Sequence, residues 1–460
     1  MYILLYNYIK IWWGDILTFK SFEKNIKKVI FFSFIIFIYF YFFNASINAT
    51  SINTKEEELK SSLYCNNDII MDLESGNIIF EKNAHSKVYP ASTTKVLTAL
   101  LAIENLNLDD TVVVSKNAVY STPIGSSIMY LKPEEVISIK NLLYGLLLHS
   151  GNDAANALAE AVSGNIPDFI NLMNLKLKEI GCNDTHFTNT HGFHDSNHYT
   201  TVFDMAKLFR YAVQNETFKE IIATKEITIP KTNKTEERTY KNTNKMFNPK
   251  YTKMYYEYVI GGKTGYTEEA RGTFVGYGKK DDKTVIVCAF DGSQNISGNE
   301  GRFLDSIQLF EYAFNNFNKY NLLDKNDFTF CINDESYNKK YTFSIKDDMY
   351  ALYNNDFHFS RYTLNLTQND LESYNLNDKV GTLTVSTNGN SVDVTNTLDL
   401  ILVSKENYFN ASSNIKLYIN IILCILCIVI ILFTFKNYFK KSKKKIRKTN
   451  TKMQRRNYNI

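Results

Sequence analysis

The sequence is best interpreted from one stretch, Pro90-Ala91-Ser92-Thr93-Thr94-Lys95-Val96-Leu97-Thr98-Ala99-Leu100-Leu101. Its apolar residues recur with helical spacing, so we expect a helix that begins at or near Ser92. Lys95 follows Ser92 by three positions, which places both side chains on one face of the first turn. A lysine that loses its proton can activate a neighbouring serine as a nucleophile. A lone Ser-x-x-Lys also arises by chance as a solvated helical turn, so it needs support elsewhere in the chain.

A second polar motif, Ser150-Gly151-Asn152, lies between two segments of helical composition, 142–148 and 154–162. It must form a tight turn in which Gly151 allows the bend and the two polar side chains project. Asn152 also suits the N-cap of the following helix, which is the purely structural alternative.

A third motif, Lys263-Thr264-Gly265, lies on a predicted strand. The glycines around Lys263 remove side chains and permit close approach of a ligand. A phosphate-binding loop is excluded, because the Gly-x-x-x-x-Gly-Lys-Ser/Thr pattern is absent and no helix follows.

The order of the predicted elements indicates an α/β (α+β) fold with an antiparallel sheet and packed helices over residues 50–320. We expect a hairpin at 68–73 and 78–81, helices at 169–180, 201–214 and 299–320, and three antiparallel strands at 259–266, 273–277 and 284–290. Residues 321–412 are rich in Thr, Asn, Asp and Tyr and contain alternating runs, which predicts a small all-β domain that acts as a spacer or docking module.

Two apolar runs flank these domains. Residues 1–49 end in an apolar run followed by small residues, the pattern of a cleaved signal peptide or, alternatively, an N-terminal anchor. Residues 417–435 are long enough and apolar enough for a C-terminal transmembrane helix. The tail 436–460 carries eleven Lys and Arg and no acid, which places it in the cytoplasm by the positive-inside rule. We therefore expect a cell-membrane protein with its catalytic domain on the extracellular face.

The formal net charge of +4 comes from these flanks. Residues 51–435 alone carry a net charge of about −10, so the sequence does not support a nucleic-acid partner.

A loop with three histidines, His191, His194 and His198, suggests zinc at first sight. The residues between His194 and His198 are poor helix formers, and no Glu follows His194 as a His-Glu-x-x-His site requires, so we expect no metal there. The widely scattered cysteines do not indicate a disulfide framework, although a single bridge stays open.

The ordered set of motifs resembles that of the low-molecular-mass penicillin-binding proteins, the D-alanyl-D-alanine carboxypeptidases of serine peptidase family S11. The resemblance runs from about residue 68 to 403, and its signature segments are Ala91-Ser92-Thr93-Thr94-Lys95, Ser150-Gly151-Asn152-Asp153-Ala154-Ala155, His198-Tyr199-Thr200-Thr201, Gly262-Lys263-Thr264-Gly265-Tyr266-Thr267 and Val380-Gly381-Thr382-Leu383. The C-terminus departs from the family, since many members end in an amphipathic surface helix. The implied fold is a β-lactamase/DD-peptidase-like domain.

The resemblance implies a role for each matching residue. Ser92 would form an acyl-enzyme with the penultimate D-Ala of a peptidoglycan stem peptide, Lys95 would be the general base, and Ser150 would relay a proton to the leaving D-Ala. The implied substrate-binding residues are Asn152 for an amide, Lys263 and Thr264 for the terminal carboxylate, the adjoining Gly265, and Tyr266, whose N–H would complete an oxyanion hole with that of Ser92. No metal or cofactor is implied, and β-lactam antibiotics should acylate Ser92.

Two other functions remain open. A β-lactamase on the same fold would need a deacylating Glu on a loop after the second motif; the nearest candidate, Glu179, lies in a predicted helix. A non-catalytic β-lactam sensor or cell-wall-binding protein would be expected to have lost a motif or to carry a larger cytoplasmic domain than 436–460.

Overall fold

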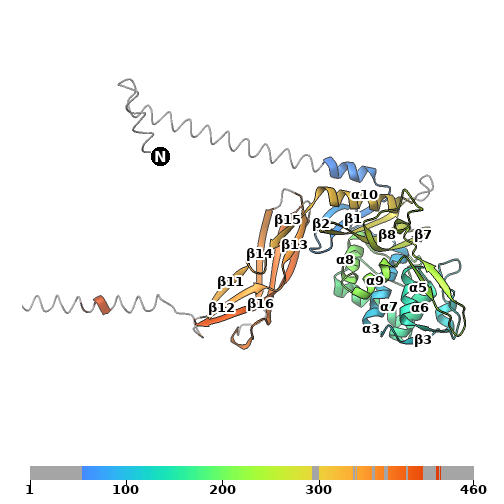
Figure 1. Cartoon of the computed structure of the whole chain (residues 1–460), viewed down its shortest axis with the longest axis horizontal. Helices are drawn as coiled ribbons and strands as arrows, with labels where there is room; N and C mark the ends of the chain where they lie inside the picture. Colours follow the sequence, from blue (N-terminus) through green and yellow to red (C-terminus); the bar gives the residue numbers. More distant parts are fainter. Residues whose placement is uncertain are drawn as a thin grey trace, which may run out of the picture. The chain divides into compact units, whose positions relative to one another are not determined.

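The computed structural model describes residues 54–292, 300–334, 337, 339–354, 358–366, 371–389, 392–407, 421–423 and 425 (Figure 1). The predicted leader at 1–49, most of the predicted span at 417–435 and the tail at 436–460 lie outside these residues. Within the described part of the chain, no helix is both long and apolar enough to cross a membrane.

A five-stranded antiparallel sheet forms the centre of the first compact unit. Its order is β2-β1-β9-β8-β7, so the N-terminal hairpin pairs with strands from far along the chain. The bounds are β1 (Asn67–Asp72), β2 (Ile78–Lys82), β7 (Val259–Thr267), β8 (Arg271–Lys280) and β9 (Lys283–Gly292). The predicted hairpin and the three predicted antiparallel strands are confirmed. Most residues of β8 and β9 are buried, because helices cover both faces of the sheet.

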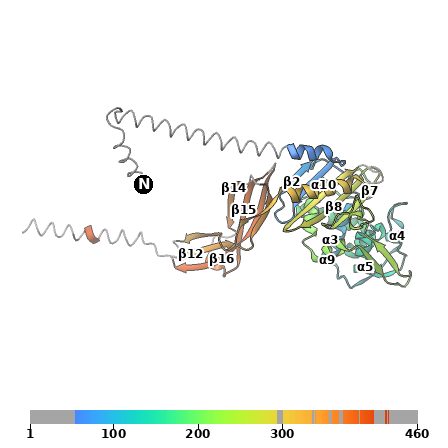
Figure 2. The same ribbon diagram turned by 45° about the horizontal axis from the view of Figure 1, so that its top comes forward.

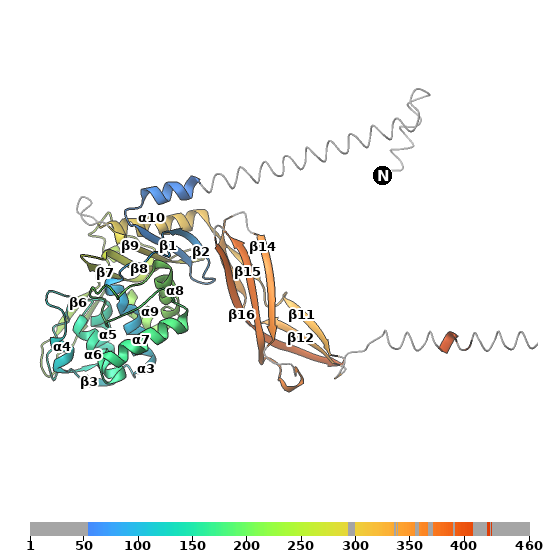
Figure 3. The same ribbon diagram turned by 180° about the vertical axis from the view of Figure 1, so that it is seen from behind.

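One face of the sheet is covered by α10 (Gly301–Asn316) and by the helix over residues 54–62 (Figure 3). Phe303 and Phe310 of α10 pack with Phe274 and Val287 of the sheet in one apolar cluster. The prediction of a helix to residue 320 was wrong, because Phe317 is extended and β10 begins one residue later. The sequence Asn315-Asn316 favours this end, since asparagine is a weak helix former.

The other face is covered by a layer of helices around α3 (Lys95–Asn105), in which every residue from Lys95 to Ala102 is buried. Ser138, Asn165, Thr201 and Asn215 cap four of the helices with their side chains. The other helices of this layer are α5 (Ile139–Leu147), α6 (Asn152–Ser163), α7 (Ile166–Ile180), α8 (Val202–Ala212) and α9 (Glu216–Ala223). The same region contains α4 (Lys116–Tyr120), η2 (Lys245–Phe247) and two small antiparallel sheets, β3 (Thr111–Val113) with β4 (Val136–Ser138) and β5 (Glu226–Ile229) with β6 (Arg238–Lys241).

The C-terminal region is built from strands, as its alternating sequence predicts. β10 (Asn318–Leu323) pairs with β13 (Met349–Tyr353). A second five-stranded sheet, whose longer strands are seen in Figure 2, has the order β11-β12-β16-β15-β14. Its bounds are β11 (Thr329–Asp334), β12 (Lys339–Ile345), β14 (His358–Leu366), β15 (Lys379–Gly389) and β16 (Val392–Asn407), with η3 (Leu371–Ser373). The two compact units interleave here, since residues 348–363 and 384–397 group with 1–323, so a separate domain at 321–412 stays a prediction.

Candidate active site

Ser92 and Lys95 meet at the start of the central helix of the helical layer. Ser92 lies in a short 3-10 turn, η1 (Ala91–Thr94), and α3 begins at Lys95, so the expectation that the α-helix opens at Ser92 is off by one turn. Lys95 Nζ lies 2.8 Å from Ser92 Oγ, which confirms the predicted proximity of the two side chains. This distance is short enough for direct proton transfer.

The ammonium group of Lys95 is fully buried. Its Nζ also donates a hydrogen bond to the carbonyl of His191 at 2.9 Å. Burial, and secondarily the charge of Lys263, lowers the pKa of Lys95 well below its ordinary value. A lysine whose pKa is lowered in this way gives up its proton more readily, so it can act as the general base for Ser92.

The backbone around the nucleophile is strained and tightly packed. Ala91 has a φ of +48°, a left-handed conformation that only a well-determined surrounding structure maintains. Gly192 has a φ of +85°, and a Cβ added to it would lie 1.7 Å from the carbonyl oxygen of Ala91. Only glycine therefore fits at position 192, and the loop that carries His191 is held directly against the turn that carries Ser92.

The turn at 150–152 bends differently from the prediction. Ser150, not Gly151, adopts the left-handed conformation, with a φ of +66°. Gly151 has an ordinary φ of −61° and is instead restricted by space, because a Cβ there would lie 3.0 Å from Met129 Cβ. The N-cap of α6 is Gly151, so the alternative role of Asn152 as the cap is wrong. Among the described residues, no hydrogen bond is formed by the Asn152 side-chain amide, which leaves it free for a ligand.

The third motif reaches the second through Lys263. Lys263 Nζ lies 3.1 Å from Ser150 Oγ and donates to the carbonyl of Thr264 at 2.8 Å. Burial, together with the charge of Arg302, lowers the pKa of Lys263 to about 7. Thr264 Oγ1 bonds Thr243 Oγ1 at 2.7 Å. Residues 113 positions apart in the chain thus form one hydrogen-bonded group.

A cavity of about 620 Å³ lies over these residues. Its lining includes every predicted site residue except the two lysines, which lie beneath its floor with 0% and 1% exposure. The lining residues that the prediction named are Ser92, Ser150, Asn152, Thr264, Gly265 and Tyr266. β7 is the edge strand of the sheet, and a Cβ on Gly265 would lie 2.7 Å from Ser92 N, so this strand runs directly beside the nucleophile.

Arg302 is the site residue that the sequence prediction missed. It lines the cavity, is 8% exposed, and donates to the carbonyl of Gly265 and to the carboxylate of Glu300. Arginine keeps its charge even when buried, so Arg302 supplies a permanent cation where Lys263 is close to losing its proton. The sequence did contain an indication of this role. A cation in the first turn of a helix is unfavourable with the helix dipole, so an arginine at that position suggests a function other than stabilising the helix.

The histidines of the 191–198 loop are engaged in structural contacts. His198 lies 2.8 Å from Thr94 Oγ1 through Nε2, and its Nδ1 accepts the N–H of Thr188 at 3.0 Å. Its ring stacks on Phe187, and burial lowers the pKa values of His191 and His198 to about 3. Both histidines are therefore neutral. His198 holds the loop against η1, whereas His191 Nδ1 accepts the N–H of Phe193 within the loop and His191 lines the cavity.

The chain is similar to known proteins over the part that carries these motifs. A family profile described as D-alanyl-D-alanine carboxypeptidase matches residues 53–294. The D-alanyl-D-alanine carboxypeptidase DacF of Bacillus subtilis (strain 168) is 30% identical over 263 residues, which cover 56% of this chain and 64% of that relative. The carboxypeptidase DacB2 of Mycobacterium tuberculosis is 33% identical over 248 residues, covering 54% of this chain and 81% of that relative.

The similarity of folds extends further along the chain. The crystal structure of the D-alanyl-D-alanine carboxypeptidase DacD from Francisella tularensis is similar with a TM-score of 0.54 and 25% identity. That match covers 76% of this chain and 95% of that one. The chain spans just under two thirds of the length of the Bacillus relative.

Proposed function

The chain belongs to the D-alanyl-D-alanine carboxypeptidase family, serine peptidase family S11, and on that premise we propose that it removes the terminal D-alanine from peptides ending in D-Ala-D-Ala. The observation that carries the proposal is the 2.8 Å distance between Ser92 Oγ and the buried Nζ of Lys95. A serine beside a lysine with a lowered pKa is an activated nucleophile.

Acylation follows from the contacts around Ser92. Uncharged Lys95 takes the proton of Ser92 Oγ, which attacks the carbonyl carbon of the penultimate D-Ala. The backbone N–H groups of Ser92 and Tyr266 stabilise the oxyanion, supported by the position of β7 beside Ser92. Ser150, hydrogen-bonded to Lys263, passes a proton to the nitrogen of the leaving D-Ala as the peptide bond breaks, and it recovers a proton from the ammonium of Lys95, so that the proton taken from Ser92 leaves with the D-Ala. Water then attacks the ester, releases the shortened peptide and restores Ser92.

Recognition of the C-terminal carboxylate is assigned to the part of the cavity lined by β7 and the start of α10. Thr264 supplies a hydroxyl and Arg302 a guanidinium, while Lys263 lies just beneath them. A carboxylate is bound most strongly by charged donors in a site protected from water. The free amide of Asn152 is placed to bond the substrate's backbone.

The substrate class is a peptidoglycan stem peptide, and β-lactam antibiotics are expected to acylate the same serine because they present a reactive carbonyl beside a carboxylate. We propose that the acyl-enzyme with a β-lactam is long-lived. The β-lactamase alternative lacks support, since Glu179 is a surface residue of α7 paired with Lys176 at 3.0 Å and does not line the cavity. The non-catalytic alternative lacks support too, because all three motifs meet at one cavity.

The location of the protein is a proposal that rests on the sequence. A leader at 1–49, a span at 417–435 and a basic tail would hold the catalytic domain on the outer face of the cell membrane, where peptidoglycan lies. A small all-β domain at 321–412 would then act as the spacer between the membrane and the catalytic domain.

The test is intact mass of the full-length chain after brief incubation with benzylpenicillin, followed over hours, together with D-alanine release from a D-Ala-D-Ala peptide. We expect D-alanine release and a persistent adduct on the wild type, and neither on Ser92→Ala. Rapid loss of the adduct with consumption of penicillin would instead identify a β-lactamase. A folded wild-type protein that forms no adduct and releases no D-alanine would overturn the proposal.

A further inference from the structure

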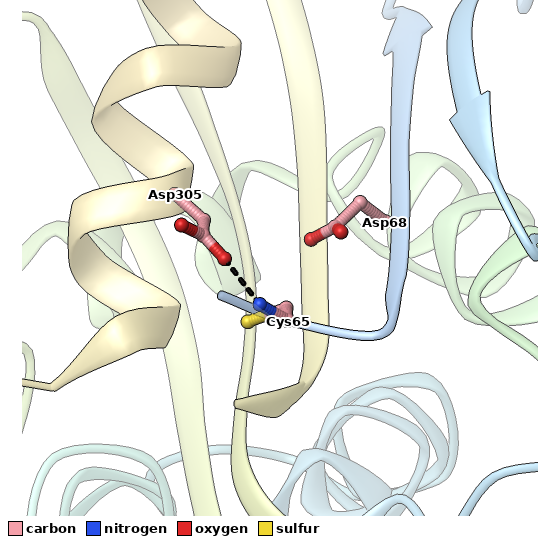
Figure 4. A group of neighbouring side chains, drawn as sticks. All are labelled: Cys65, Asp68 and Asp305. Carbon is pink, nitrogen blue, oxygen red and sulfur yellow. Dashed lines mark hydrogen bonds between the residues drawn. The ribbon is translucent and has the colours of Figure 1, made fainter. Parts of the chain in front are cut away.

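A second group of ionisable side chains lies between the sheet and α10, apart from the active site. We call Cys65, Asp68 and Asp305 the carboxylate–thiol cluster (Figure 4). Cys65 lies two residues before β1, Asp68 lies at the start of β1, and Asp305 lies in the second turn of α10. Each of the three is 0% exposed, and one ligand atom from each lies within 4.8 Å of the others.

The carboxylates of the cluster lack the partners that buried charges require. Neither oxygen of Asp68 has a hydrogen bond, and one oxygen of Asp305 has none, while the other accepts the N–H of Cys65 at 2.6 Å. The neighbouring cation, Lys82, lies 3.9 Å from Asp68 and donates instead to the carbonyls of Cys65 and Leu63. Buried carboxylates without donors are costly unless they are paired or coordinate a metal.

The packing around the thiol is built to accommodate it. A Cβ on Gly292 would lie 2.8 Å from Cys65 Sγ and 3.1 Å from the backbone nitrogen of Arg302. Glycine at the end of β9 therefore leaves the space in which the sulfur sits. Cys65 forms no disulfide, so its sulfur remains available as a ligand.

We propose that the carboxylate–thiol cluster binds a zinc ion through Cys65 Sγ and one oxygen each of Asp68 and Asp305. Zinc accepts sulfur and carboxylate oxygen together in a tetrahedral site, whereas calcium and magnesium prefer oxygen ligands alone. Neighbouring ligand atoms of such an ion lie roughly 3.5 Å apart, so inward movements of about 1 Å would close the site. Binding displaces into solvent the thiol proton and any proton held by the two buried carboxyl groups, and the fourth position is left to a water molecule.

The ion would have a structural role, and it does not depend on the proposed peptidase activity. It would join the start of β1 to α10. Asp305 lies three residues after Arg302, on the next turn of the same helix. A zinc ion at the cluster would thereby help to hold the helix turn that brings Arg302 to the active-site cavity.

The test uses the full-length chain, stripped with a chelator and then titrated with zinc. We expect about one zinc per chain, with a rise in Tm of about 5 °C at a hundred-fold excess over Kd. Cobalt in place of zinc should give a thiolate-to-cobalt absorption band. Asp305→Asn should weaken zinc binding at least about 100-fold, and Cys65→Ser should remove the cobalt band.

The matched control is Cys331→Ser, because Cys331 is an exposed free thiol on β11 outside the cluster. This variant should bind zinc as the wild type does. The proposal is overturned if the folded wild type takes up no zinc, or if Asp305→Asn and Cys65→Ser bind zinc unchanged. Should a cluster variant fail to fold, the chelator-dependent Tm and the cobalt band of the wild type still decide, and their absence would overturn the proposal.

Discussion

The active-site cavity and the carboxylate–thiol cluster both contain buried ionisable side chains, but the two regions differ in the hydrogen bonds that these side chains form. In the active site, Lys95 Nζ and Lys263 Nζ each have two hydrogen-bond partners within 3.1 Å. In the cluster, both oxygens of Asp68 and one of Asp305 have none. Burial disfavours charge in both places. Burial and a neighbouring cation lower the pKa values of the two lysines, which favours the reactive uncharged amine. A buried carboxylate without donors is instead costly unless it takes up a proton or binds a cation.

The largest expected effect concerns the chemistry of the first region. Lys95→Met removes the general base and should lower both D-alanine release and acylation by benzylpenicillin by about 10³-fold. The Tm should stay equal or rise, because the variant no longer buries an amine. The measurement is the acylation rate beside thermal unfolding.

Lys178→Met is the matched control, since Lys178 is an exposed lysine of α7. It should leave both quantities unchanged. A Lys95→Met protein that keeps half of the wild-type rate would show that Lys95 is buried for structural reasons alone, and the contrast between the two regions would disappear.

The next effect concerns the packing that supports the nucleophile. Gly192→Ala would place a Cβ 1.7 Å from the Ala91 carbonyl at a φ of +85°. It should cost about 3 kcal/mol or more of unfolding free energy and lower the acylation rate. Gly164→Ala has a similar φ of +77° but open space around it, so it should cost only about 1 kcal/mol. Equal costs in chemical denaturation would mean that the contact with Ala91 is unimportant.

A smaller effect is expected at Arg302, which lies between the two regions on α10. Arg302→Leu should raise the KM for a peptide with a free C-terminal carboxylate about 10- to 100-fold. A peptide whose C-terminus is amidated should be affected much less, because it carries no charge for Arg302 to bind. Steady-state kinetics with both peptides measures the difference. The same loss for both peptides would assign Arg302 to positioning Gly265 instead of to binding the carboxylate.

The smallest effect is a dependence of stability on pH from Lys263. Its pKa is about 7 in the folded protein against an ordinary 10.5, so between these values the unfolded chain holds a proton that the folded chain has lost. The burial of Lys263 therefore carries no protonation penalty above pH 10.5. As the pH falls from 10.5 towards 7, this penalty grows and the folded protein loses stability relative to the unfolded chain. Lys263→Met should exceed the wild type in Tm by an amount that is largest near pH 7 and vanishes near pH 10.5. A difference that does not vary with pH would contradict the lowered pKa.

Local features of the fold and site could be read from the sequence. The Ser92–Lys95 proximity follows from a spacing of three residues in a helical turn, and the hairpins follow from alternation and turn residues. The end of α10 and the bend at 150–152 were less predictable. In the second case Ser150 takes the strained φ because packing against Met129, not backbone freedom, requires the glycine at 151.

What the sequence by itself determined is therefore the set of reactive residues and the family they mark, because each motif is contained within a few neighbouring positions. Only the tertiary structure brought Lys263 to Ser150 and added Arg302 to the cavity. It also gathered Cys65 from the segment before β1, Asp68 from β1 and Asp305 from α10. The lowered pKa of Lys95 is likewise a tertiary property. Burial and long-range contact depend on how distant segments pack, and no spacing along the chain encodes them.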